Sequence, residues 1–138
     1  MIALHNVEDS GYKREDLEAW LERICESKGK AIQELNYVFC DDEYLYEMNM
    51  QYLNHDTYTD IITFDYSEGE AIHSDIFISV ERVSDNASKF AVPFSKELLR
   101  VMAHGILHLV GLNDKTEAEK EIMRKEEEVL MSMFHVEQ

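Results

Sequence analysis

With 138 residues, of which 45% are hydrophobic and 30% are charged, the chain has the length and composition of one globular domain with a single core. Its 29 acidic residues outnumber its 13 basic ones and give a net charge of −16, which argues against broad contact with a nucleic-acid backbone. No apolar run approaches the roughly 18 residues of a membrane-spanning helix, and the N-terminal stretch MIALHNVEDS lacks the features of a secretory signal, so we expect a cytoplasmic protein that makes no membrane contact.

The first part of the chain predicts two strands and two helices. The apolar residues 2–7 favour a short strand, and residues 14–29 carry apolar side chains at helical spacing. The segment ELNYVFC predicts the second strand. The segment DDEYLYEMNMQYL predicts the second helix, which we expect to be capped by Asp42 and to bury the stripe Leu45, Met48 and Tyr52.

The second part of the chain predicts two paired strands and three helices. The strands are TDIITFDY and SDIFISV, joined by a polar turn, and a short helix over residues 83–90 follows. Pro93 then separates it from a helix that Ser95 is expected to cap. A last helix over residues 116–134 is predicted to bury Ile122, Val129, Leu130 and Met133. Since strands and helices do not alternate regularly, we predict one α+β domain, a mixed sheet of about four strands packed with about five helices.

Two histidines stand four residues apart in the segment HGILHLVGLND, residues 104–114. At about 100° per residue, His104 and His108 lie within roughly 40° of each other on a helix, on the side that the apolar residues leave free. Two adjacent buried imidazoles without partners would cost about 1 to 3 kcal/mol for each unsatisfied group, and a shared cation removes that cost. The spacing therefore favours a metal site over simple packing.

The residues after this pair complete a candidate metal site. Gly111 tolerates the left-handed conformation that ends a helix, and Asp114 can return its carboxylate toward the two ring nitrogens. Zinc sites commonly take two histidines one helical turn apart and a third ligand from beyond the helix. We therefore predict a metal ion on His104, His108 and Asp114. The peptidase motif HExxH requires a glutamate where this chain has Gly105, so a metallopeptidase is disfavoured.

These residues resemble the bacterial YbeY family, rRNA-maturation factors that are metal-dependent endoribonucleases with the signature HGxLHLxGxDH. The signature matches at His104, Gly105, Leu107, His108, Leu109 and Gly111. Upstream, NMQYLNHDTYTDIITF is similar to the family pattern NxxYRxxDxPTDVLSF, with matches at Asn49, Tyr52, Asp56, Thr59, Asp60 and Phe64. The segment SDIFIS is similar to GDIxIS, and the family's acidic helix after the metal motif is matched by Met123 and Glu127.

The resemblance implies a single endoribonuclease domain over residues 1–138, with a zincin-like metal helix that holds one zinc ion. It further implies cleavage of single-stranded RNA in ribosome biogenesis, including 16S rRNA maturation, with ribosomal RNA and ribosomal small-subunit proteins as partners. Two positions depart from the family pattern. Asp114 stands where the family usually has a histidine ligand, and its harder oxygen donor allows a different divalent metal. Leu53 stands where the family has an arginine that contacts RNA.

The second departure matters because a guanidinium suits phosphate contact and the charge that develops in phosphoryl transfer, and leucine supplies neither. The candidate replacements are Lys89, Arg100 and Lys115. A different class of function, a ribosome-assembly factor with a structural metal and no cleavage activity, remains as an alternative. The acidic charge and Leu53 favour that alternative.

Two further carboxylates are candidate catalytic residues. Asp60 and Asp75 each begin a strand-like run, where a carboxylate can reach the metal site as a partner of a histidine or as a general base. The competing interpretation of both is an acid that caps a turn. The remaining histidines have no partner at ligand spacing and are expected on the surface or in loops: His5, His55, His73 and His135.

Overall fold

The computed structural model describes residues 1–134 of the chain. Its elements are β1 (Ile2–His5), a 3-10 turn η1 (Val7–Ser10), α1 (Arg14–Ser27), β2 (Ile32–Cys40), α2 (Asp42–Leu53), β3 (Ile61–Asp65), β4 (Ile72–Ser79), α3 (Val80–Phe90), α4 (Phe94–Leu109) and α5 (Glu117–Ser132). The four strands form one sheet in the order β1-β2-β4-β3. Both β1–β2 and β2–β4 are parallel, and β3 is antiparallel to β4. The predicted single-domain α+β fold with a mixed sheet is therefore confirmed.

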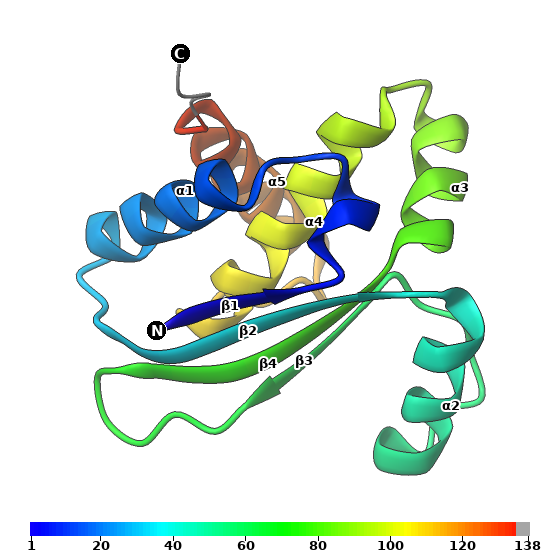
Figure 1. Cartoon of the computed structure of the whole chain (residues 1–138), viewed down its shortest axis with the longest axis horizontal. Coiled ribbons are helices and arrows are strands. Elements are labelled where there is room, and N and C mark those ends of the chain that lie inside the picture. Colours follow the sequence, from blue (N-terminus) through cyan, green and yellow to red (C-terminus); the bar gives the residue numbers. More distant parts are fainter. Residues whose placement is uncertain (135–138) are drawn as a thin grey trace.

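The sheet has two differently covered faces. Helices α1, α4 and α5 lie over one face, whereas α2 lies against the other face at one end (Figure 1). Strand β4 alternates accordingly, because Ile72, Ser74, Ile76 and Ile78 are buried while His73, Asp75 and Phe77 are partly exposed. The main core thus lies between the sheet and α1 and α4.

Polar side chains tie the helical layer together inside this core. The Trp20 indole on α1 donates a hydrogen bond to the carbonyl of Leu130 on α5, at 2.8 Å. The Tyr37 hydroxyl on β2 donates to the carbonyl of Met102 on α4, also at 2.8 Å. Because buried polar groups are costly unless they are paired, the first contact holds α5 against α1 and the second holds α4 against the sheet.

Several predicted helix ends differ from the structure. Asp41 caps α2, since its carboxylate accepts from the backbone N–H of Tyr44, and Asp42 is the first helical residue. Pro93 precedes the first residue of α4, so Ser95 lies inside the helix, where its carbonyl accepts from the Tyr12 hydroxyl. A proline suits a helix start because it lacks the N–H that would be unsatisfied there.

The predicted apolar stripes of α2 and α5 are also partly wrong. On α2 the buried residues are Leu45 and Asn49, and Tyr52 is 61% exposed because this helix covers only one end of the sheet. On α5 the buried positions are Met123, Glu127 and Leu130, whereas Ile122 and Val129 face solvent. The side of α5 that meets α4 therefore includes a carboxylate. No helix within residues 1–134 has the length and apolar character that crossing a membrane requires.

Candidate metal centre

The two histidines of α4 face each other as their spacing predicts. The Nε2 atoms of His104 and His108 are 2.9 Å apart, and the ring planes are inclined by 79°. Both side chains are partly exposed, with 18% and 33% of their surface accessible. The buried side of α4 is mostly apolar and packs against the sheet. The two imidazoles therefore lie on the side of the helix that stays partly exposed.

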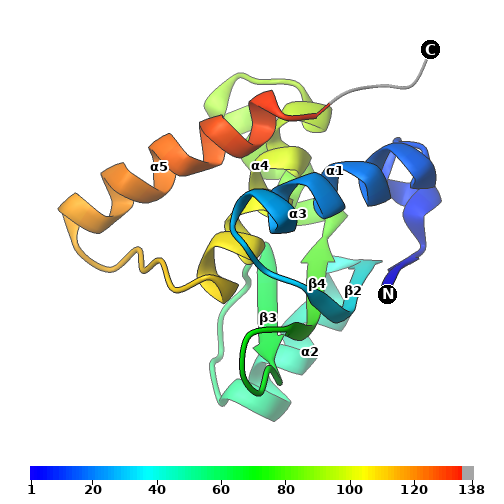
Figure 2. The same ribbon diagram turned by 90° about the vertical axis from the view of Figure 1, so that its left-hand side faces the viewer.

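Asp114 is returned to these histidines by the chain reversal after α4. Gly111 adopts φ +102°, a left-handed conformation that glycine accepts without strain, and the N–H of Leu112 donates to the carbonyl of Leu107. Figure 2 shows the connecting segment, residues 110–116, looping out before α5 begins. One carboxylate oxygen of Asp114 then lies 3.3 Å from Nε2 of His104 and 3.7 Å from Nε2 of His108.

The segment that carries Asp114 is held in place by the start of α5. Thr116 accepts a hydrogen bond from the N–H of Glu119, and the Glu119 carboxylate accepts from the N–H groups of Thr116 and Lys115. These hydrogen bonds lower the pKa of Glu119, so the cap keeps its charge at neutral pH. The position of Asp114 is therefore determined at both ends, by Gly111 before it and by the capping box after it.

The three donor atoms fit a small divalent cation. The atoms of His104, His108 and Asp114 all lie within 4.8 Å of one another. Tetrahedral ligands at the usual zinc distances of about 2.0 to 2.1 Å are about 3.3 Å apart. The three measured separations of 2.9, 3.3 and 3.7 Å are centred on that value. Two imidazoles and one carboxylate also leave a fourth position free, as in catalytic rather than structural zinc sites.

A second layer of charged residues supports His104. Its Nδ1 lies 2.7 Å from one carboxylate oxygen of Glu127 on α5, and the other oxygen of Glu127 accepts from Arg100 at 3.2 Å. The Arg100 guanidinium also donates two hydrogen bonds of 2.8 Å to Glu97. A carboxylate on Nδ1 favours the tautomer that leaves Nε2 free for a metal. These contacts with the two glutamates raise the pKa of Arg100 above its ordinary value.

The burial of this network identifies residues that the sequence argument did not assign to the site. Glu97 and Glu127 are only 2% and 1% exposed, which is rare for carboxylates. Arg100 is shared between the two buried carboxylates, and Glu127 meets one further guanidinium, that of the largely exposed Arg124, at 3.9 Å. The Glu127 carboxylate against Nδ1 of His104 favours a cation on Nε2 of the same imidazole. The sequence signal for Glu127 was its position within the buried side of α5, which we had assigned to Ile122 and Val129.

Asp60 lies next to this network. Its carboxylate accepts a hydrogen bond from Asn86 on α3, at 3.4 Å, and its backbone carbonyl accepts from the N–H of Ser79. Burial raises the pKa of Asp60, whereas the charges of Arg100 and His104 act in the opposite direction. Asp60 is not one of the three ligands, and its catalytic role stays a prediction.

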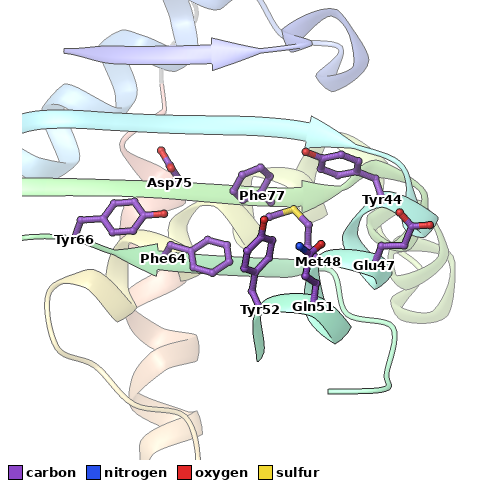
Figure 3. A pocket seen from close by; sticks show the side chains of 9 residues that line it. All are labelled: Tyr44, Glu47, Met48, Gln51, Tyr52, Phe64, Tyr66, Asp75 and Phe77. Atoms are coloured by element: carbon purple, nitrogen blue, oxygen red, sulfur yellow. The ribbon is translucent and has the colours of Figure 1, made fainter. Parts of the chain in front are cut away.

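The structure does not bring Asp75 to the metal centre. Its side chain points away from α4, because the residues of β4 that face α4 are the even-numbered ones. Asp75 instead accepts from the amide of Asn36, at 2.9 Å. It lines a cavity of about 570 Å³ between α2 and the outer face of the sheet, together with rings such as Tyr52, Phe64 and Phe77 (Figure 3). The prediction that Asp75 serves this site is therefore corrected.

None of the other predicted residues within residues 1–134 joins the three ligands. His5 and His55 are exposed, and His73 lies 3.5 Å from Glu34 on the outer face of the sheet. His135 lies outside the described residues. Lys89 and Lys115 are exposed, and Arg100, the third candidate for phosphate contact, is occupied by its two glutamates.

Gly105 faces the core rather than the metal ligands, which bears on the peptidase alternative. A β-carbon at this position would lie 3.0 Å from the side chain of Ile61 and 3.2 Å from that of Ile76. We expect Gly105→Glu, which creates the motif HExxH, to unfold the protein rather than confer peptidase activity, because it buries a carboxylate among isoleucines. Thermal denaturation by circular dichroism measures this. A melting temperature equal to that of the wild type would contradict it.

Comparisons with known proteins point to one family. The family model described as Endoribonuclease YbeY matches residues 3–135. A protein from Flavobacterium johnsoniae named Endoribonuclease YbeY is 57% identical over 119 residues, 86% of either chain. One of the same name from Bacteroides thetaiotaomicron is 48% identical over 88% of either chain. The solution structure of a Thermotoga maritima protein is similar with a TM-score of 0.71 at 27% identity, covering 97% of this chain and 89% of that one.

Proposed function

This chain belongs to the YbeY family of endoribonucleases, and we propose that it is a zinc-dependent, single-strand-specific endoribonuclease of ribosomal RNA maturation. Its proposed partners are ribosomal RNA, including 16S rRNA, and small-subunit proteins in the cytoplasm. The observation that supports cleavage most directly is the group of His104, His108 and Asp114, whose donor atoms lie at ligand distances and leave one coordination position for substrate or water.

Each residue around the proposed ion has a separate task. His104, His108 and Asp114 would hold the ion, which when bound polarises a phosphate oxygen and lowers the pKa of water. Glu127 orients His104 through Nδ1. Asp60 is our candidate for the proton acceptor, because burial raises its pKa, its carboxylate accepts from the neutral amide of Asn86, and the next residue, Ile61, packs against Gly105 of α4.

The direct test uses purified protein and two labelled RNAs, one single-stranded and one duplex. We expect the protein to cleave the single-stranded RNA and to leave the duplex intact. Cleavage is expected to stop when a chelator is added and to resume when Zn²⁺ is restored. A preparation of His108→Ala made in the same way controls for contaminating nucleases. Cleavage that this variant retains in full would overturn the assignment.

Asp114 decides which metal the site prefers. We expect Asp114→Ala to bind zinc at least about tenfold more weakly, because it removes one of three ligands. Asp114→His is expected to bind zinc again and to discriminate more strongly against Mg²⁺ and Mn²⁺, since imidazole is a softer donor than carboxylate. Elemental analysis and competition with a chromophoric chelator measure both. Equal zinc content in the wild type and in Asp114→Ala would exclude Asp114 as a ligand.

A ribosome-assembly factor with a structural metal is the second candidate, favoured by the net charge of −16 and by Leu53. This alternative predicts that the metal-bound protein cleaves no RNA. It also predicts that removing the metal with a chelator lowers the melting temperature and weakens association with the ribosome. The cleavage assay above therefore separates the two functions.

A further inference from the structure

The proposed nuclease needs a cation for the RNA backbone that its sequence does not supply at the expected place. Leu53, at the end of α2, is 40% exposed and uncharged. Arg100 is close to the metal ligands, but its guanidinium is divided between Glu97 and Glu127 and only 20% of the side chain is accessible. Neither residue offers a free positive charge to a phosphate.

Two other cations share a cavity with two of the metal ligands. A cavity of about 230 Å³ between α4 and α5 has His104 and Asp114 in its lining, and Lys120 and Arg124 also line it. These two basic residues are four apart on α5, so they lie on one side of the helix about 6 Å apart along its axis. The opening next to the proposed ion is thus bordered by two long cationic side chains.

Both side chains are available for a ligand. Lys120 and Arg124 are 57% and 68% exposed. Their ion pairs are long, 3.8 Å from Lys120 to Glu117 and 3.9 Å from Arg124 to Glu127. The Lys120–Glu117 pair is exposed at both ends and contributes little stability. Glu127 is buried, but it has shorter contacts to Arg100 and His104, so Arg124 can turn toward a phosphate without leaving that carboxylate unpaired.

Lys120 and Arg124 are the cations of this cavity whose side chains are open to solvent. Arg100 also lines the cavity, but its guanidinium is already neutralised by Glu97 and Glu127. A divalent ion on His104, His108 and Asp114 would add positive charge beside the two exposed cations, in a chain whose net charge is −16. An anion is therefore attracted to this opening more than to most of the remaining surface.

We propose that Lys120 and Arg124 bind the phosphodiester backbone of the RNA next to the cleaved bond. This inference rests on the proposed nuclease function and names its substrate-binding residues. An ammonium and a guanidinium, both on a rigid helix, contact neighbouring phosphates without reading the base sequence. The two residues thereby replace, from α5, the contact that an arginine at Leu53 would make from α2.

The test compares the double variant Lys120→Gln/Arg124→Gln with Lys125→Gln. Lys125 is a matched control, because it is an exposed lysine on the same helix and does not line the cavity. Binding of a fluorescent single-stranded RNA is measured by anisotropy in the presence of a chelator, so that no cleavage occurs, at several salt concentrations. All substituted side chains are exposed, and melting temperatures verify that each variant is folded.

We expect the double variant to bind RNA about 10- to 100-fold more weakly at low salt, which is about three- to tenfold for each cation. The slope of log affinity against log salt is expected to fall in magnitude by about 1.4, or about 0.7 for each lost phosphate contact. Lys125→Gln is expected to keep the wild-type slope. With zinc present, the double variant is expected to raise KM much more than it lowers kcat.

The outcomes separate this inference from the function on which it rests. Wild-type protein that neither binds nor cleaves single-stranded RNA overturns both. Wild-type protein that cleaves RNA while the double variant keeps its affinity and salt slope overturns only the assignment of Lys120 and Arg124. An equal loss in Lys125→Gln also overturns it, because the effect is then one of overall charge.

Discussion

Replacing either histidine of α4 by alanine is expected to reduce metal-dependent RNA cleavage at least about a hundredfold, because each change removes one of three ligands. The two variants are not expected to be equally stable. His104 pairs with the buried Glu127, and His104→Ala leaves that carboxylate oxygen without its partner. His108 has no such buried partner among the described residues, since its Nε2 meets only His104 and Asp114.

The difference in stability between His104→Ala and His108→Ala is expected in the thermal unfolding of the two metal-free variants. An unsatisfied buried carboxylate costs about 1 to 3 kcal/mol. For a chain of 138 residues this lowers the melting temperature of His104→Ala by about 3 to 10 °C relative to His108→Ala. Differential scanning calorimetry in chelator measures it, and Glu127→Gln combined with His104→Ala is the control, since it removes the charge left behind. Equal melting temperatures for the two single variants would show that Glu127 does not depend on His104.

The parts of the site that were predictable are those encoded within one element. The spacing of His104 and His108 fixes their common side of a helix, and Gly111 determines where that helix ends. Asp114 follows within three residues, so its return to the histidines is a short-range property. The helical and strand segments were predicted for the same reason, because periodicity reports on local structure.

The parts that were missed depend on contacts between distant segments. Glu127 reaches His104 across 23 residues, and although its spacing from Met123 and Leu130 places it on the buried side of α5, that spacing does not identify the partner that makes burial of a carboxylate possible. The burial of Glu97 likewise depends on Arg100 and on the packing of α4. A charged residue is not expected in a core unless its partner is known, and the partner of Glu127 belongs to another helix.

Asp75 is a different kind of error, since the sequence did contain the necessary signal. Successive side chains of a strand point to opposite faces, so Asp75 must share a face with Phe77 and oppose Ile76. Ile76 and Ile78 are both fully buried against the helical layer. Applying strict alternation to SDIFIS would have placed Asp75 on the outer face, away from α4.

Among substitutions of partly exposed side chains, Arg100→Met is expected to lower the stability of the protein most, because Arg100 holds the Glu97–Arg100–Glu127 network together. Arg100→Met removes the cation that both carboxylates share, and Glu97 is left buried with no other cation within 4.0 Å among the described residues. Breaking a buried ion pair in this way costs about 3 to 5 kcal/mol. The melting temperature is therefore expected to fall by about 10 to 15 °C for a chain of 138 residues.

A second variant distinguishes loss of the pair from loss of charge balance. Glu97→Leu/Arg100→Met removes both members of the Glu97–Arg100 ion pair. Replacing a buried ion pair by apolar residues of similar size often leaves the stability of a protein unchanged. We expect the double variant to recover at least half of the lost melting temperature. Zinc affinity is expected to stay about tenfold or more below the wild type, because Glu127 no longer has the guanidinium that orients it toward His104. If the double variant recovers wild-type zinc affinity together with stability, Arg100 supports the fold alone and the orientation of Glu127 is fixed by α5.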